Sequence, residues 1–172
     1  MIRTLKLLAL LATVLLTGTA LVRAGDDKVL SKEEFLAKVI DCNVTETDLA
    51  DKAVKNAQSE DVRKYAQRLV KDHTANKDKA VDLAKDLKIG VVTGLSAEHK
   101  EAMAKLLLAT GKDFDRKFIQ HMVRSHKKAV KMLEANAKGS ASEQVRAFAK
   151  NALPAIREHL DMARKLDKQL NP

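Results

Sequence analysis

The sequence is poor in the residues that break helices, cross-link chains or stack on bases. Its 172 residues include no tryptophan, one tyrosine, one cysteine, six glycines and two prolines. Single-strand binders stack successive bases on aromatic side chains, so we expect no nucleic-acid partner. The single cysteine, Cys42, excludes an intramolecular disulfide, and we expect it to be buried as a small hydrophobe. Stability must therefore come from apolar burial.

Long apolar runs are also scarce, and the strongest one lies near the N-terminus. Residues 7–16 are about ten strongly apolar positions, whereas a membrane span needs about 20. Arg3 and Lys6 precede this run, and Val22 and Ala24 follow it at the −3 and −1 positions of a cleavage site. This pattern is typical of a cleavable secretory signal. A retained N-terminal anchor is the alternative.

The expected organisation is one exported domain behind that signal. We expect a signal peptide over residues 1–24, a flexible segment over 25–30 and a folded domain over 31–170. The location would be periplasmic or secreted, with no integral membrane span after cleavage.

The charge of the chain is positive but spread out. The formal net charge is +9, and Arg3, Lys6 and Arg23 account for three of these charges, which leaves +6 for the domain. Acidic and basic residues alternate without a long basic block, which favours a solvated helical surface. The alternative is weak contact with anionic envelope polymers or lipid headgroups. No feature of the sequence specifies an oligomeric state.

Apolar residues recur every three or four positions in four long segments, which is typical of amphipathic helices. We expect these helices at about 31–57, 59–90, 112–138 and 140–170, with a shorter helix at 97–110. The N-caps expected for the first two and for the short helix are Ser31, with Glu34 in a capping box, Ser59 and Ser96.

Three further positions bear on how these helices begin and end. Ser140 and Glu143 can form a second capping box for the last helix. Gly90 is placed to end the second helix in a left-handed conformation. Pro154 lies within the last helical pattern and should kink that helix or split it.

The fold class that follows is all-α. The short helix lies in the long connection between the second and third long helices, and it can carry the chain back along the bundle. The second and third long helices would then be parallel. This connectivity is that of a ferritin-like four-helix bundle.

Four polar residues interrupt the apolar stripes, one on each long helix: Glu46, His73, His126 and His159. A buried polar group without a partner costs about 1–3 kcal/mol, so these side chains should meet one another, a water or a metal ion. Counting 1.5 Å per residue from the turns places the first three at about one height and His159 roughly 9 Å away. Bundle tilt or the Pro154 irregularity would have to bring His159 level.

Two interpretations of these residues remain open. One is a neutral hydrogen-bonded polar core, to which Asn43, on the same stripe as Glu46, could contribute. The other is a metal site made of imidazoles and one carboxylate, which suits one transition-metal ion such as Zn, Fe, Ni or Cu. A thioether ligand would favour copper. Three methionines, Met122, Met132 and Met162, lie about one helical turn from these histidines.

Several catalytic patterns are missing. No Glu-x-x-His or Asp-x-x-His occurs, so the di-iron chemistry of ferritin-like bundles has no motif behind it. Nor does the chain contain a Ser-His-Asp pattern, a Gly-rich phosphate loop or Cys-x-x-Cys. The sequence thus supports no enzymatic activity. His99 and His121 fall off the stripes, and we expect both on the surface.

Four segments carry a family resemblance. They are Glu46-Thr-Asp-Leu-Ala50, Arg68-Leu-Val-Lys-Asp72-His73, Phe114-Asp115-Arg-Lys-Phe118 through Met122-Val-Arg-Ser-His126, and Leu153-Pro154-Ala-Ile-Arg157-Glu158-His159-Leu160. In this order and spacing the chain resembles the secreted bacterial ferritin-like domains of unknown function that are often described as membrane or outer-membrane proteins. The resemblance covers about residues 31–168 and implies a ferritin-like bundle in the cell envelope, with no established activity. Ala50 departs from it, because the family usually has glycine there.

Three functional hypotheses follow. The first is an exported binding module that holds a metal ion or small ligand at Glu46, His73 and His126, with His159 nearby. The second is a structural or stress-protective envelope protein whose polar core only fixes helix register. The third and weakest is a ferritin-like redox enzyme, because its motif is missing.

Overall fold

Five helices make up the secondary structure of the described part of the chain. The computed structural model describes residues 28–90 and 96–171, so the expected signal peptide lies outside the described residues. The helices are α1 (Lys32–Asn56), α2 (Glu60–Asp86), α3 (Ala97–Leu107), α4 (Gly111–Gly139) and α5 (Glu143–Leu170). The all-α prediction is confirmed, and α3 ends about three residues earlier than expected.

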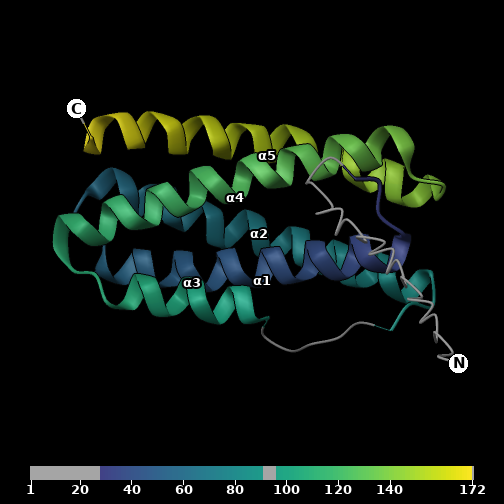
Figure 1. The fold of residues 1–172 in the computed structure, drawn as a ribbon, viewed down its shortest axis with the longest axis horizontal. Coiled ribbons are helices and arrows are strands. Elements are labelled where there is room, and N and C mark those ends of the chain that lie inside the picture. Colours follow the sequence, from purple (N-terminus) through teal and green to yellow (C-terminus); the bar gives the residue numbers. More distant parts are fainter. Residues whose placement is uncertain (1–27, 91–95, 172) are drawn as a thin grey trace, which may run out of the picture.

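The four long helices form two antiparallel hairpins that pack on each other. Helices α1 and α2 make one hairpin, and α4 and α5 make the other. Helix α3 runs back along the bundle against α1 and α4, so α2 and α4 point the same way (Figure 1). This single long crossover is the ferritin-like connectivity predicted from the sequence.

Two apolar clusters fill the bundle, and on every long helix a polar segment separates them. One cluster holds the C-terminal half of α1, the N-terminal halves of α2 and α4, and the end of α5; its large members include Tyr65, Phe114 and Phe118. The other holds the opposite halves, with Phe35, Leu36 and Leu133 among its members. The polar residues expected at the centre lie between the two clusters.

Three of the four N-caps predicted from the sequence are confirmed. Ser31 and Glu34 form the expected capping box, and Ser59 and Ser96 are N-caps. The prediction for α5 is wrong, because its N-cap is Ser142, whose side chain accepts a hydrogen bond from Val145. The loop between α4 and α5 is therefore longer than the sequence suggested.

The end of α2 also differs from the prediction. The helix ends at Asp86, and the left-handed residue that follows is Lys88, with φ of 56°, rather than Gly90. The amide of Ile89 bonds back to the carbonyl of Ala84, which closes the last turn before Gly90 is reached. Lysine at this position carries a conformational cost that glycine would not.

Pro154 does not split α5. The helix is continuous from Glu143 to Leu170 with Pro154 inside it. Pro154 and Lys150, whose carbonyl loses its helical partner, are both exposed. Water can therefore satisfy the freed carbonyl, which limits the cost of the missing bond.

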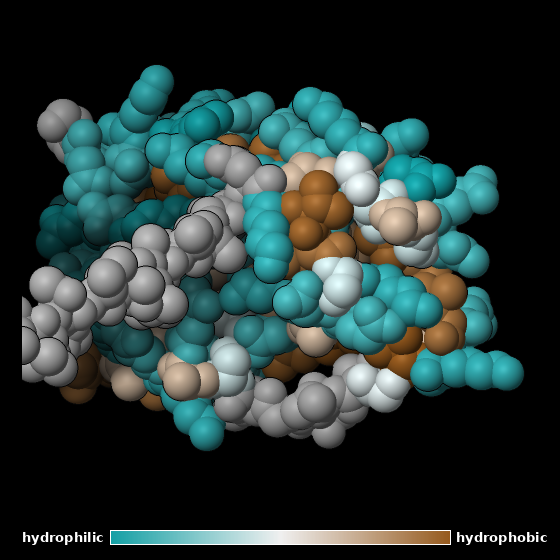
Figure 2. Space-filling model, turned by 45° about the vertical axis from the view of Figure 1, so that its right-hand side comes forward, coloured by the Kyte–Doolittle hydropathy of each residue, from teal (hydrophilic) through white to brown (hydrophobic). Residues whose placement is uncertain are grey.

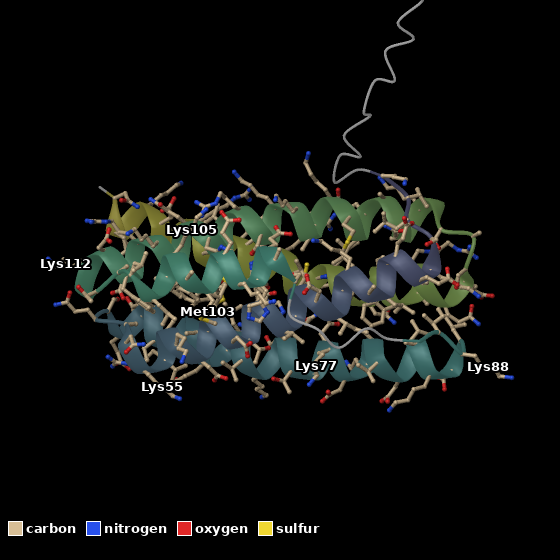
Figure 3. The ribbon with its side chains drawn as sticks, turned by 60° about the horizontal axis from the view of Figure 1, so that its bottom comes forward. Lys55, Lys77, Lys88, Met103, Lys105 and Lys112 are labelled. Atoms are coloured by element: carbon tan, nitrogen blue, oxygen red, sulfur yellow. The ribbon has the colours of Figure 1, made fainter. Side chains whose placement is uncertain are left out.

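The outer surface is hydrophilic over most of the face seen in Figure 2. Lysines such as Lys55, Lys88 and Lys112 project away from the bundle, as Figure 3 shows. Among the described residues, the exposed large apolar side chains are Val29, Leu107 and Leu108. In the same part of the chain, no helix is long and apolar enough to cross a membrane.

Candidate metal centre

The three predicted histidines of the stripes meet in the middle of the bundle. His73, His126 and His159 come from α2, α4 and α5, and their ring centroids are 5.2–5.5 Å apart in all three pairs. Their exposed fractions are 2%, 0% and 1%. The sequence placed His159 about 9 Å out of level, and this expectation is wrong.

The loop before α5 explains part of this difference. Because the N-cap of α5 is Ser142 rather than Ser140, two residues, or about 3 Å of rise, are removed from the expected offset. The rest of the expected offset along the bundle can be spanned by the length of the imidazole side chains. His159 therefore belongs to the centre.

Each imidazole uses one ring nitrogen to bond an acceptor outside the triangle. Nδ1 of His73 lies 2.8 Å from Oδ1 of Asn43, and Nδ1 of His126 lies 2.9 Å from the carbonyl of Met122. Nε2 of His159 lies 2.9 Å from Oδ2 of Asp72. Since these oxygens only accept, the nitrogens that face them carry the protons.

The orientation of Asn43 supports this assignment for His73. Its Nδ2 donates to the carbonyl of Val39 at 2.7 Å, and Asn76 donates to its Oδ1 at 3.2 Å. The amide oxygen is thus turned toward His73, and the proton of a neutral His73 lies on Nδ1.

The second nitrogen of each ring is left without a hydrogen-bond partner. Nε2 of His73, Nε2 of His126 and Nδ1 of His159 are all buried and unsatisfied. One ring nitrogen from each histidine can be chosen so that all three lie within 4.8 Å of one another. In neutral imidazoles these nitrogens present lone pairs, which is the form that binds metal ions.

Glu46, on α1, lies beside two of the three histidines. Its Oε2 lies 2.9 Å from Nε2 of His73 and 3.6 Å from Nε2 of His126, and Ser125 donates to its Oε1 at 2.6 Å. The contact with His73 is short, but the ring nitrogen is not aligned for a hydrogen bond. Lone pairs on both atoms repel at this distance unless a proton or a metal ion lies between them.

Burial and charge set the protonation of these groups in opposite directions. Burial alone would raise the pKa of Glu46, but the nearby His126 and His73 and the hydrogen bond from Ser125 outweigh it, so its pKa is lowered. Burial lowers the pKa of His126, and it lowers the pKa of His159 to about 4. Burial therefore favours the neutral imidazole of His126 and of His159, and the lowered pKa of Glu46 favours its ionised carboxylate; these are the forms that act as metal ligands.

A charged network on the outside holds the ring of His159. Arg68 forms a double hydrogen bond with Glu158, at 2.8 and 2.7 Å, and its Nε lies 3.3 Å from Oδ2 of Asp72. The same Asp72 oxygen accepts from His159. Sequence reasoning did not assign Asp72 or Ser125 to the centre, although both lie directly beside a predicted histidine in the chain.

The two histidines expected on the surface have different positions. His99 is only 2% exposed, and its Nε2 lies 3.1 Å from Asp48 on α1, so the prediction for it is wrong. His121 is half-buried, and burial lowers its pKa. Cys42 is also half-buried, and burial raises the pKa of its thiol to about 12. Helix α3 covers this side of α1 and α4, which periodicity alone could not reveal.

The donor set fits a transition-metal ion. Three neutral imidazole nitrogens and one carboxylate suit Zn, Cu, Fe or Ni, and each ring has the outer hydrogen bond that orients ligating histidines. No thiolate takes part in the cluster of His73, His126 and His159. The arrangement can bind and hold a cation. It matches no di-iron pattern, since the chain lacks Glu-x-x-His.

The fold and the centre define an all-helical, ferritin-like four-helix bundle with a buried histidine and carboxylate cluster. The chain belongs to the family of the domain of unknown function DUF4142, whose sequence pattern matches residues 19–166. This confirms the resemblance to a bacterial domain-of-unknown-function family. A comparison with curated proteins finds no match.

Solved structures show the same fold at low identity. A crystal structure of a DUF305 fragment from Deinococcus radiodurans is 18% identical, with a TM-score of 0.69 over 81% of this chain and 95% of that chain. The protein described as CopM in the Cu(II)-bound form is 16% identical, with a TM-score of 0.71 over 83% and 99%. A DUF305 protein from Streptomyces coelicolor, described as secreted, is 12% identical, with a TM-score of 0.69 over 82% and 94%.

Proposed function

We propose that this protein is an exported binding module that holds one transition-metal ion between His73, His126, His159 and Glu46. The observation that carries the proposal is the set of three buried ring nitrogens without partners beside a buried carboxylate. A purely structural polar core would be expected to pair these atoms with protein groups, because each unpaired one costs about 1–3 kcal/mol.

Copper(II) is the first choice among the metals, and zinc is the second. Imidazole nitrogen suits both ions, and Cu(II) forms the most stable complexes in the divalent series. The similarly folded CopM is described in a Cu(II)-bound form, which supports the same choice. The methionines are not needed for it: the Met122 carbonyl accepts from His126, the Met162 sulfur lies 3.8 Å from Arg68, and Met132 belongs to one of the apolar clusters.

Export is part of the proposal. The apolar run at residues 7–16 and the cleavage pattern at Val22 and Ala24 support a signal peptide. The secreted description of the Streptomyces coelicolor protein with the same fold is consistent with it. A purified periplasmic protein whose measured mass corresponds to a start at Gly25 would bear this out, and a retained Met1 would contradict it.

The decisive experiment measures metal binding by the exported protein without an affinity tag. After chelation and dialysis, the protein is titrated with Cu(II) and then Zn(II) against a competing chelator, and bound metal is counted by mass spectrometry. We expect one ion per chain. His73→Ala, His126→Ala, His159→Ala and Glu46→Gln should each weaken binding by about a hundredfold or more, because each removes a ligand.

Two further variants separate ligands from other buried groups. Asp72→Asn keeps an acceptor for His159 but removes its charge, and we expect a loss of about 10–100-fold in affinity. His99→Gln removes a buried histidine outside the centre and should leave affinity unchanged. A wild-type protein that binds neither ion and melts at the same temperature with and without them would refute the proposal and favour the structural role.

A further inference from the structure

A pocket borders the centre at Glu46. It has a volume of about 660 Å³ and lies between α1, α3 and α4. Of the four centre residues, Glu46 lines this pocket, whereas none of the three histidines does. Glu46 thus has one oxygen toward the imidazoles and the other bonded to Ser125, which also lines the pocket.

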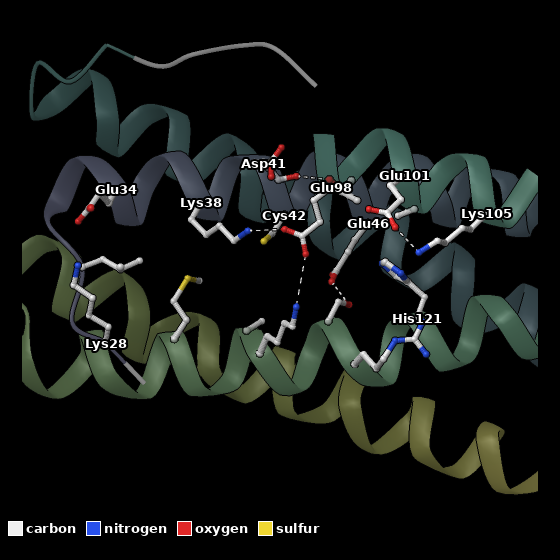
Figure 4. Close-up of a pocket in the computed structure, with 18 residues that line it drawn as sticks. Lys28, Glu34, Lys38, Asp41, Cys42, Glu46, Glu98, Glu101, Lys105 and His121 are labelled. Carbon is white, nitrogen blue, oxygen red and sulfur yellow. Dashed lines mark hydrogen bonds and ion pairs between the residues drawn. The ribbon is translucent and has the colours of Figure 1, made fainter. Parts of the chain in front are cut away.

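A thiol and an imidazole lie in the pocket wall on either side of Glu46. Cys42 precedes Glu46 by one turn of α1, and His121 precedes Ser125 by one turn of α4. Because α1 and α4 run in opposite directions, Cys42 and His121 lie on either side of Glu46 along the pocket, as Figure 4 shows. Carboxylate, thiol and imidazole groups therefore follow one another along this wall.

Charge in the pocket does not oppose the passage of a cation. The pocket is lined by five acidic and five basic side chains, and three of the basic ones pair with acids of α3: Lys38 and Lys128 lie 3.1 and 3.8 Å from Glu98, and Lys105 pairs with Glu101. The two contacts of Glu98 also join α3 to α1 and to α4. These acids offset the cations that would otherwise repel a metal ion at the mouth.

We infer that this pocket is the route by which a transition-metal ion reaches the histidines, and that Glu46 passes the ion from the pocket to the centre. The inference rests on the proposed metal site. Ser125 is a positioning residue on this route, because its hydroxyl holds the carboxylate of Glu46 at the boundary between the pocket and the centre.

The test compares rates with equilibrium affinity. Cu(II) loading of the metal-free protein and Cu(II) removal by excess chelator are followed by stopped-flow absorption, and the Kd is measured separately. Ala129→Phe narrows the pocket one turn of α4 beyond Ser125. We expect it to slow loading and removal by about tenfold or more and to leave the Kd within about threefold, since it removes no ligand.

A matched variant on the same helix provides the control. Gln120 lines a neighbouring pocket of about 280 Å³ that does not include Glu46, so Gln120→Phe should leave both rates unchanged. Ser125→Ala frees the carboxylate and should speed removal of the metal. If circular dichroism shows that Ala129→Phe is unfolded, Ala129→Leu replaces it.

The outcomes distinguish the route from the site. Wild-type binding with unchanged rates in the folded Ala129 variant would overturn the route and leave the metal centre standing. Equal slowing by Ala129→Phe and Gln120→Phe would also overturn it. Absence of Cu(II) binding by the wild-type protein would instead refute the proposed function itself.

Discussion

The tautomer of each histidine is decided by the one atom that it faces outside the centre. The amide oxygen of Asn43 accepts from His73, and the backbone carbonyl of Met122 accepts from His126. The carboxylate of Asp72 accepts from His159. Each ring must then turn a lone pair inward, where it has no hydrogen-bond partner. This arrangement resembles the outer hydrogen bonding of metal-bound imidazoles more than that of a satisfied polar core.

Protonation of the same rings should make the metal-free protein sensitive to acid. Burial lowers the folded-state pKa of His159 to about 4, from an ordinary value of 6.5. Below pH 6.5 the unfolded chain therefore binds a proton that the folded chain does not, so stability falls as the pH drops toward 4. We expect His159 to contribute a loss of about 3 kcal/mol at most over this range.

Urea unfolding of chelator-treated protein at several pH values measures this effect. The lowered pKa of His126 and that of His121 act in the same direction. In a His159→Leu variant, the free energy of unfolding should therefore depend less steeply on pH, but the dependence should not disappear. An unchanged slope in that variant would show that His159 is already charged in the folded protein.

At the scale of single helices, the junction between α1 and α2 depends on a side chain from α4. Asp115 is 1% exposed, and its two oxygens accept from the backbone amides of Gln58 and Ser59, at 3.0 and 2.7 Å. These amides precede the first turn of α2 and have no helical partner of their own. One carboxylate therefore joins the two hairpins at this end of the bundle.

Removing this carboxylate should destabilise the fold measurably. We expect Asp115→Ala to lower the free energy of unfolding by about 2–3 kcal/mol, because two amides lose their acceptor. Asp113→Ala, two residues away, removes a solvent-accessible carboxylate paired with Lys117 at 2.8 Å and should cost clearly less than Asp115→Ala. Equal costs in chemical denaturation would contradict this role of Asp115.

For the whole molecule, the polar centre is where all four long helices meet. Each helix passes from one apolar cluster to the other at the residue that it contributes to the centre. A bound ion would therefore cross-link α1, α2, α4 and α5 at their middles. Helix α3, which contributes none of these residues, would stay outside the cross-link.

Metal removal should accordingly loosen all four long helices together. At a free metal concentration of 100 times the Kd, binding adds about 2.7 kcal/mol of stability, or a rise in Tm of about 5–11 °C. Hydrogen exchange should slow around Glu46, His73, His126 and His159 on loading and stay unchanged in α3. Protection confined to one hairpin would show that the ion is held by fewer helices.

The periodicity of the sequence by itself determined the helices, their order and the residues that would form the polar centre. Stripes of apolar residues set which face of each helix is buried, and Ser31, Ser59 and Ser96 mark where helices begin. The polar exceptions on those stripes were visible because burying them without partners is costly.

Only the tertiary structure decided the distances between the residues of the centre and which side chains surround them. A loop residue, Ser142, sets where α5 starts, and this register brings His159 level with His73. The packing of α3 against α1 and α4 buries His99 and forms one wall of the pocket beside Glu46. Such contacts join residues far apart in the chain, and a pattern with a period of 3.6 residues records which face of a helix is buried but not which helix covers it.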